Sequence, residues 1–262
     1  MTDPTETTAW RSAFKGPPLE DVLLEHLEEL AFLAIQRRKL LFAHDLPLRD
    51  FEPHEERIAA HWDGLVIGGE ASVELARARL SEPDPWDVFA AAWVWVQLGA
   101  PKPDEILEAI DGSEGEALLG WRAALRACDP ASLGGLAEPA LASPSAQVKS
   151  AFTYALSWQG LLPSEATPNL LASQDVSVRR DLARAAGFGG IDEATSRRLS
   201  ASLVTDSEPE VRAAAIWSVA LMNPQGATQW CRDRASKGEL EPVHARILGL
   251  HGGSQDTAAL RS

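Results

Sequence analysis

Six apolar positions recur at a nearly constant interval along most of this chain. The clearest copies are residues 171–183 and 204–216, which share a Val-Arg pair at the same place. In that frame, successive positions are 30, 30, 30, 33 and 32 residues apart. We call these positions the anchors; they are Val88, Leu118, Val148, Val178, Val211 and Val243. A period of about 30 residues accommodates two short helices and their turns, so a repeat protein is predicted.

The residues around the anchors predict helices. A turn-forming, acidic or proline-containing segment precedes each anchor, which is typical of a helix N-terminus. Apolar residues follow four and eight positions later, as Ala92 and Val96 do after Val88, and they share one helical face. Glycines such as Gly99 and Gly160 come where such helices would end. Strand-like alternation is scarce, so the predicted fold class is all-α.

The anchors resemble those of HEAT-like repeats, particularly the short form called phycobilisome-lyase-type. Two Asp/Glu-x-x-Val-Arg signatures carry the likeness, which extends over residues 80–252. It implies a right-handed α-solenoid of about six helical pairs, because one pair cannot bury its apolar face alone. The second helix of each pair would line a concave docking face. The resemblance also implies a structural ladder between neighbouring repeats, made by Asp175, Arg179, Glu208 and Arg212.

The first 80 residues follow a different pattern. Residues 1–18 are expected to form a flexible tail, residues 19–80 an N-terminal helical cap, and residues 81–262 the HEAT-like array. The helices of the cap are predicted over Leu19–Phe42, Arg49–Val66 and Ala71–Leu80, separated by Pro47 and by Gly68-Gly69. An array needs such a cap because its end would otherwise expose apolar surface.

A second resemblance concerns residues 20–80. The segments 25–38, 49–50 and 55–65 look like the start of an uncharacterised proteobacterial family of HEAT-like proteins. Members of that family often sit near type VI secretion and effector genes. The resemblance therefore implies an immunity or accessory protein for a type VI-secreted effector, and it carries over no activity.

Composition disfavours several classes of protein. The chain has 38 acidic and 24 basic residues, a net charge of −14, which does not suit a binder of duplex nucleic acid. No apolar run approaches the roughly 18–20 residues that cross a bilayer. Residues 1–14 are polar and acidic, unlike a secretory signal. Two cysteines make no disulfide framework. We therefore expect a cytoplasmic protein with no membrane contact.

No catalytic constellation is found. The Gly-x-Ser-x-Gly elbow and the P-loop are both missing. His54 and His61 could share a helix face, but the His-Glu-x-x-His zinc spacing is not present because residue 58 is Ile. These histidines are expected to be solvated or to cap helices, and Cys128 and Cys231 to be packing residues. We predict no catalytic residue, metal or cofactor.

The middle third of the chain is the most suggestive part for binding. Residues 81–170 hold 12 acidic and only 4 basic residues, together with five of the nine tryptophans. Aromatic residues with few lysines are typical of an interface. Trp93 and Trp95 are two apart on one predicted helix, so at least one should lie near the surface. The interface candidates are Trp86, Asp87, Trp93, Trp95, Trp121, Glu114, Glu116 and Trp158.

The sequence thus predicts a non-enzymatic, protein-binding solenoid with a basic partner, which the carboxylates would attract. The alternative is a small-ligand or chromophore-handling HEAT-like protein with a tryptophan-lined pocket. A HEAT-like DNA glycosylase is disfavoured, because its groove would need basic residues.

Overall fold

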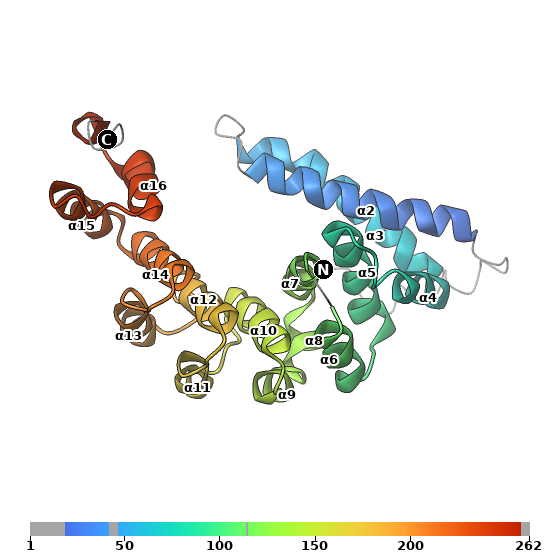
Figure 1. Cartoon of the computed structure of the whole chain (residues 1–262). Helices are drawn as coiled ribbons and strands as arrows, with labels where there is room; N and C mark the ends of the chain where they lie inside the picture. Colours follow the sequence, from blue (N-terminus) through green and yellow to red (C-terminus); the bar gives the residue numbers. More distant parts are fainter. Residues whose placement is uncertain (1–18, 42–46, 114, 258–262) are drawn as a thin grey trace. The chain divides into compact units, whose positions relative to one another are not determined.

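The computed structural model describes residues 19–41, 47–113 and 115–257, so the predicted tail over 1–18 lies outside the described residues. Over these ranges the chain forms fifteen α-helices and three 3-10 segments, with no strand (Figure 1). The all-α prediction is confirmed. The chain divides into two compact units, Met1–Ser132 and Leu133–Ser262, which we call unit 1 and unit 2. The boundary falls within helix α8 (Pro130–Gly134).

Unit 1 begins with the three helices expected before residue 80. They are α2 (Glu20–Leu41), α3 (Glu52–Gly68), which follows the 3-10 segment Leu48–Phe51, and α4 (Glu70–Ala78). Gly69 separates α3 from α4 with a φ of 56°, a left-handed conformation that favours glycine. Helix α2 contacts α3, α4 and α5 (Pro85–Gly99), and Leu30 and Leu33 of α2 are fully buried. The first helices therefore pack directly on the first anchor-bearing helix.

Helices α5 and α7 (Ala117–Ala127) pack against each other more extensively than any other two helices described in unit 1. Helix α6 (Pro103–Asp111) lies between them in sequence. Gly120 permits the close approach, because a Cβ there would collide with the carbonyl oxygen of Pro85. Trp95 and Trp121 meet edge to face in the core, with ring centroids 6.2 Å apart. This pair packs the second half of α5 against the first half of α7.

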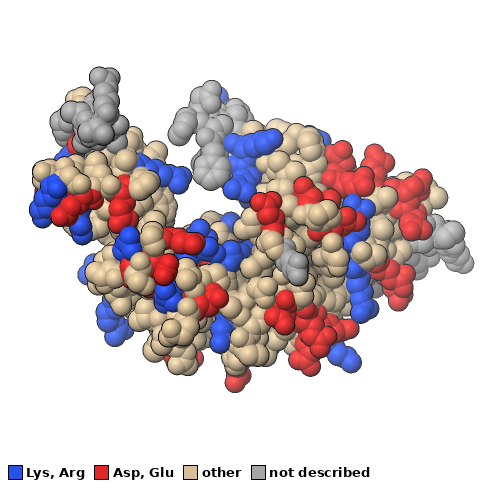
Figure 2. All heavy atoms as spheres, viewed as in Figure 1, with Lys and Arg blue, Asp and Glu red and all other residues tan. Residues whose placement is uncertain are grey.

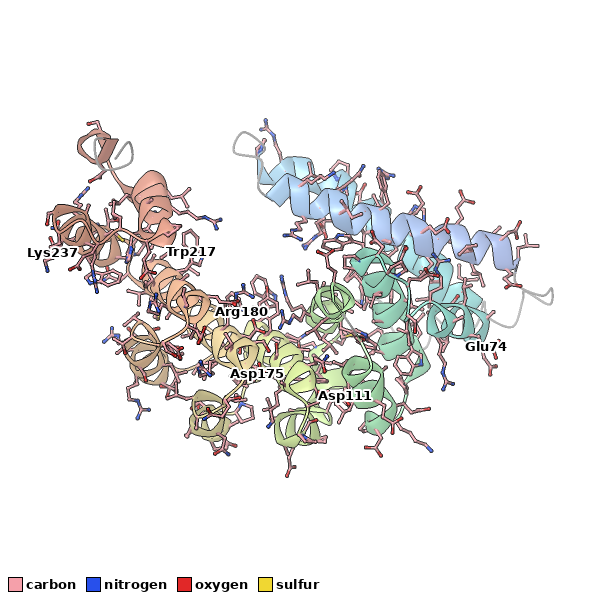
Figure 3. All side chains as sticks on the ribbon, in the orientation of Figure 1. Glu74, Asp111, Asp175, Arg180, Trp217 and Lys237 are labelled. Atoms are coloured by element: carbon pink, nitrogen blue, oxygen red, sulfur yellow. The ribbon has the colours of Figure 1, made fainter. Side chains whose placement is uncertain are left out.

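Unit 2 is built from two rows of helices (Figure 1). One row is α10 (Ala146–Trp158), α12 (Val176–Ala185), α14 (Pro209–Met222) and α16 (Pro242–His251), each in contact with the next. The other is α9 (Ala137–Ala142), α11 (Thr167–Leu171), α13 (Glu193–Leu203) and α15 (Pro224–Ser236). The remaining 3-10 segments are Ser164–Ala166 and Ser254–Thr257. Arg180 and Trp217 project from the face of the first row that turns away from α11 and α13 (Figure 3).

All six anchors lie within the first four residues of a helix, as the pattern predicted. The helices are α5, α7, α10, α12, α14 and α16. Val148, Val178 and Val211 are almost completely buried. Their helices begin with side-chain caps or proline, such as Asp175, which accepts hydrogen bonds from the backbone N–H groups of Ser177 and Val178. The period seen in the sequence therefore marks the N-terminal turns of six successive anchor-bearing helices.

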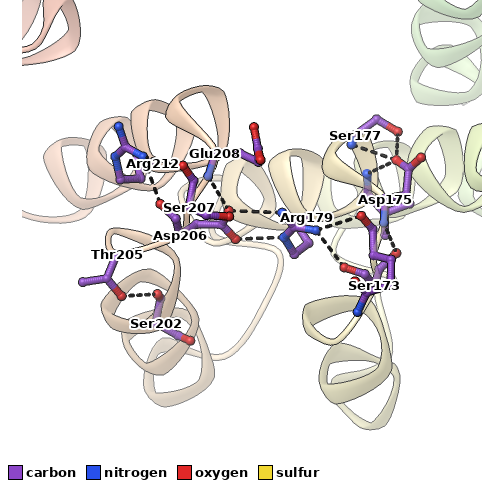
Figure 4. Close-up of polar contacts among 12 residues, drawn as sticks. Ser173, Asp175, Ser177, Arg179, Ser202, Thr205, Asp206, Ser207, Glu208 and Arg212 are labelled. Atoms are coloured by element: carbon purple, nitrogen blue, oxygen red, sulfur yellow. Dashed lines mark hydrogen bonds and ion pairs between the residues drawn. The ribbon is translucent and has the colours of Figure 1, made fainter.

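Two arginines link successive turns of unit 2, and Figure 4 shows the link made by Arg179. Arg179 donates from Nε and Nη2 to the Asp206 carboxylate, at 2.8 and 3.1 Å, and from Nη1 to two backbone carbonyls of its own turn. Arg212 repeats the arrangement toward Glu241, at 3.4 Å. The acidic acceptors thus come from the following repeat. Asp175 caps its own helix, and Glu208 donates its backbone N–H to Asp206.

Candidate binding site

Unit 1 contains a pocket of about 270 Å³ at the meeting point of α3, α5 and the end of α7. Six residues line it, and of these only one carries a charge. They are Trp62, Trp93, Gln97, Leu98, Ala127 and Asp129. The pocket combines an aromatic wall with a polar rim, a pattern typical of sites that recognise one chemical group.

The aromatic wall is a stack of two indole rings from different helices. Trp62 of α3 and Trp93 of α5 lie nearly parallel, with centroids 4.5 Å apart and an interplanar angle of 18°. The row continues along α5, because Phe89 contacts Trp93 and Trp86 contacts Phe89. Both rings of the stack are half-buried, so each keeps part of its surface accessible. An accessible indole face carries the negative part of the ring quadrupole and attracts cations.

The polar rim is held by a two-way hydrogen bond between Gln97 and Asp129. The Gln97 amide donates to Oδ2 of Asp129 at 2.7 Å, and the Asp129 backbone N–H donates to Oε1 of Gln97 at 2.9 Å. Asp129 follows Cys128, where α7 ends in extended backbone. This exchange fixes the exposed carboxylate beside the indole stack and leaves capacity on its oxygens for a further donor.

The charge of the chain is concentrated in the unit that holds this pocket. Residues 1–132 contain 25 acidic and 12 basic residues, whereas residues 133–262 contain 13 and 12. Unit 1 therefore carries −13 of the total of −14. Glu74 on α4 projects outward (Figure 3), Asp111 is exposed at the end of α6, and acidic side chains crowd the visible face of unit 1 (Figure 2). The pocket thus belongs to a strongly acidic unit, whose net negative charge attracts cationic groups.

The structure distributes the sequence-predicted interface residues over several environments. Trp93 lines the pocket, and Trp86 lies half-buried at the start of α5, with the Arg38 guanidinium 5.8 Å from its ring. Asp87 lies 3.8 Å from Arg79, and burial raises the pKa of its carboxyl group. Trp95 and Trp121 are buried in the core and present no surface to a partner.

The other predicted residues lie apart from the pocket. Glu116 is exposed just before α7, and Glu114 lies outside the described residues. Trp158 is 50% exposed at the end of α10 in unit 2, where it contacts Phe188 edge to face. The expectation that Trp93 and Trp95 face different environments is confirmed: Trp95 is buried and Trp93 walls the pocket.

Sequence reasoning missed Trp62, Gln97 and Asp129. Trp62 belongs to α3, outside the tryptophan-rich middle third, and it reaches the pocket only because α3 and α5 both lie against α2. Gln97 and Asp129 are 32 residues apart, and no local pattern joins them. One signal was available in the sequence: the separation of Gln97 and Asp129 is close to the repeat period of about 30 residues. Both residues therefore lie near the C-terminal ends of successive anchor-bearing helices, α5 and α7.

The histidines differ from the expectation of solvated or capping side chains. His54 is buried, with Nε2 2.9 Å from the Leu33 carbonyl oxygen of α2. His61 pairs with His26 of α2 instead of sharing a site with His54. Both contacts exist because α3 lies along α2, so residues 21 and 35 positions apart in sequence become neighbours.

The cysteines are suited to packing. Burial raises the pKa of the Cys128 thiol to about 12 and that of Cys231 to about 11. Both thiols are therefore protonated and weakly nucleophilic at neutral pH. Over the described ranges, no three side chains of His, Cys, Asp or Glu gather as metal ligands. Nor does any helix there combine the length and apolar character that crossing a membrane requires.

Comparison with known proteins gives no match: no family model, no curated protein and no solved structure is similar to this chain.

Proposed function

We propose that this chain is a non-enzymatic protein-binding protein whose unit 1 receives a lysine or arginine side chain of a basic partner. The observation that carries the proposal is the Asp129 carboxylate fixed beside the stacked indoles of Trp62 and Trp93. A cation gains from both, since the indole face and the carboxylate attract positive charge. The net charge of −13 on residues 1–132 would draw such a partner in.

The size of the pocket favours a side chain over a chromophore or a drug-sized ligand. Pockets for such ligands usually enclose about 300–1,000 Å³, and this one encloses about 270 Å³. Asp129 is the one titratable group among the six lining residues, and no imidazole, thiol or hydroxyl group lines the pocket beside it; this favours a role in binding. The chromophore-handling alternative has less support from this pocket.

We further propose that the two rows of helices in unit 2 are part of a HEAT-like α-solenoid. The contacts of α10 with α12, of α12 with α14, and of α14 with α16 support this, as does the recurrence of arginine–acid links. An immunity or accessory role for a type VI-secreted effector follows from the sequence resemblance alone. It would make the partner an effector with a basic surface.

The test is a pull-down from the native host, with the intact chain as bait, followed by calorimetry with the purified partner. Asp129→Asn removes the charge and retains groups for both contacts with Gln97, so it should weaken binding about tenfold, or about 1.4 kcal/mol. Trp62→Ala should weaken it further. High salt should weaken binding by wild type, because the Debye length falls from about 10 Å at 0.1 M to about 3 Å at 1 M.

Two matched controls separate the pocket from general effects. Asp104→Asn removes an exposed carboxylate of unit 1, at the start of α6, and Trp158→Ala removes an exposed indole of unit 2. Both variants should bind like wild type. A partner whose affinity is unchanged by Asp129→Asn and Trp62→Ala, or whose binding depends on Trp158, would place the binding surface elsewhere and refute the proposal.

A further inference from the structure

Two histidines face each other across the contact between α2 and α3. Nδ1 of His26 lies 3.0 Å from Nδ1 of His61, and the rings meet edge to face with centroids 5.2 Å apart. At this distance one nitrogen donates and the other accepts, so the neutral pair needs two different tautomers. A first proton can enter at an Nε2 and leave the Nδ1–Nδ1 bond intact. A second would leave both Nδ1 atoms carrying hydrogen, and two donors cannot bond to each other.

The pair has little room to rearrange. A Cβ on Gly64 of α3 would lie 2.5 Å from Nε2 of His26, so the α3 backbone runs directly against that ring. Both rings are half-buried. If the two Nδ1 atoms repel, the Gly64 backbone blocks the turn of the His26 ring toward α3, and the repulsion favours a wider spacing of the two helices. The Gly64 contact thereby converts a change in protonation into a displacement of α3.

The charged groups around His61 come from both helices. Glu25 and Glu29 of α2 favour its cationic form, whereas His26 and Arg57 disfavour it. Arg57 also lies 3.6 Å from Glu29, which offsets part of that glutamate's charge. Burial is the largest influence, and together with His26 it lowers the pKa of His61 below its usual value of 6.5. The folded pair therefore resists the second proton more than the unfolded chain does.

The residue after His61 is Trp62, one half of the indole stack. Helix α2 contacts both α3 and α5, and the Trp62–Trp93 stack is a ring contact directly between α3 and α5. A movement of α3 away from α2 would therefore displace Trp62 from Trp93.

We propose that a second proton on the His26–His61 pair separates α3 from α2 and withdraws Trp62 from Trp93, so that mild acid dismantles the pocket wall and releases a bound cationic side chain. The release of ligand rests on the proposed function; the movement of Trp62 does not. Because the pair is destabilised by protonation, its contribution is complete above about pH 6.5. That contribution is lost as the pH falls through the lowered pKa of His61.

The stack itself provides the readout. Two stacked indoles give an exciton couplet in circular dichroism. Trp95 and Trp121 form a second close pair of indoles, so the couplet of the Trp62–Trp93 stack is obtained as the difference between each spectrum and that of the same chain with Trp62→Phe at the same pH. In the intact wild-type chain the couplet should fall at least twofold between pH 7.5 and pH 5. His61→Gln and His26→Gln each remove the second titrating ring, so their couplets should vary little over the same range. His251→Gln changes an exposed histidine of unit 2 and should behave like wild type.

A second arm measures binding of a short peptide containing lysine and arginine, at pH 7.5 and pH 5. Wild type should bind several-fold more weakly at pH 5, and the two glutamine variants should bind about equally at both values. A wild-type couplet that stays constant with pH, or one that falls equally in both glutamine variants, overturns the inference. A pH-dependent couplet without peptide binding would support the movement and refute the proposed function instead.

Discussion

The sharpest structural prediction concerns Arg179. Its guanidinium joins the start of α12 to the turn before α14, through two hydrogen bonds to Asp206 and two to the carbonyl oxygens of Ser173 and Gln174. The side chains of Arg179 and Asp206 are only 14% and 10% exposed. Arg179→Ala would leave a largely buried carboxylate and two carbonyl groups without this donor.

The expected cost follows from that burial. Breaking a buried ion pair by removing one partner typically costs about 3–5 kcal/mol, and the residual exposure here favours the lower end, about 3 kcal/mol. An exposed pair provides the comparison. Arg197 contacts Glu193 one turn earlier on α13, with both side chains more than 70% exposed, and such pairs contribute about 0.3–0.5 kcal/mol. The two substitutions should therefore differ at least fivefold in their effect on the free energy of unfolding.

The assay is urea denaturation followed by circular dichroism, with the dependence on urea compared among wild type, Arg179→Ala and Arg197→Ala. Native-state hydrogen exchange would then localise the loss to α12 and α14. Hydrogen bonding to Arg179 lowers the pKa of Asp206 below 3.8 in the folded state. The contribution of this pair is therefore present above pH 3.8 and lost as the pH falls through the lowered value.

The difference between wild type and Arg179→Ala should accordingly be constant from pH 8 to pH 5 and should shrink in stronger acid. If Arg179→Ala lowers the free energy of unfolding no more than Arg197→Ala does, the contact between Arg179 and Asp206 contributes no more to stability than an exposed ion pair. In that case the interpretation of these arginines as a ladder is wrong.

Trp121→Ala should cost about 3–5 kcal/mol in thermal or chemical unfolding, because Trp121 is fully buried. Trp158→Ala should cost about 1 kcal/mol, because Trp158 is half exposed and loses mainly its edge-to-face contact with Phe188; equal effects would contradict the assignment of Trp121 to the core. Gly190→Ala should destabilise unit 2 because its Cβ would collide with the Ser157 carbonyl oxygen of α10, and the exposed Gly134→Ala, with open space around its Cβ, is the matched control.

Local chemistry accounts for what could be predicted from the sequence. The anchors locate helix starts because capping residues and buried valines act within one helical turn, as at Asp175 and Val178. The expected breaks also hold, since Gly69 has the left-handed φ that its position requires. The expected helix over 49–66 begins instead with a 3-10 segment, and α3 starts at Glu52 with Pro53 in its first turn.

The candidate site could not be predicted because it depends on contacts between distant helices. Trp62 and Trp93 are brought together by a shared support, α2, and nothing local to either residue indicates the other. The histidines show the same limitation. Spacing along α3 suggests His54 with His61, whereas the partner of each is supplied by α2. Similarly, Arg179 follows Asp175 by four residues but pairs with Asp206 in the next turn.

The residue that follows each anchor differs in chemistry between the two units. In unit 1 these residues are Phe89 and Leu119, and in unit 2 they are Lys149, Arg179, Arg212 and His244. Phe89 is buried and continues the aromatic row toward Trp93, so the position contributes to packing and to the pocket. In unit 2, Arg179 and Arg212 at this position each donate to an acidic residue of the next turn. One repeat frame thus carries an aromatic site in the acidic unit and an ionic link in the nearly neutral one. Salt should accordingly weaken ligand attraction to unit 1 more than the partly buried Arg179–Asp206 contact, because screening acts mainly on exposed charges.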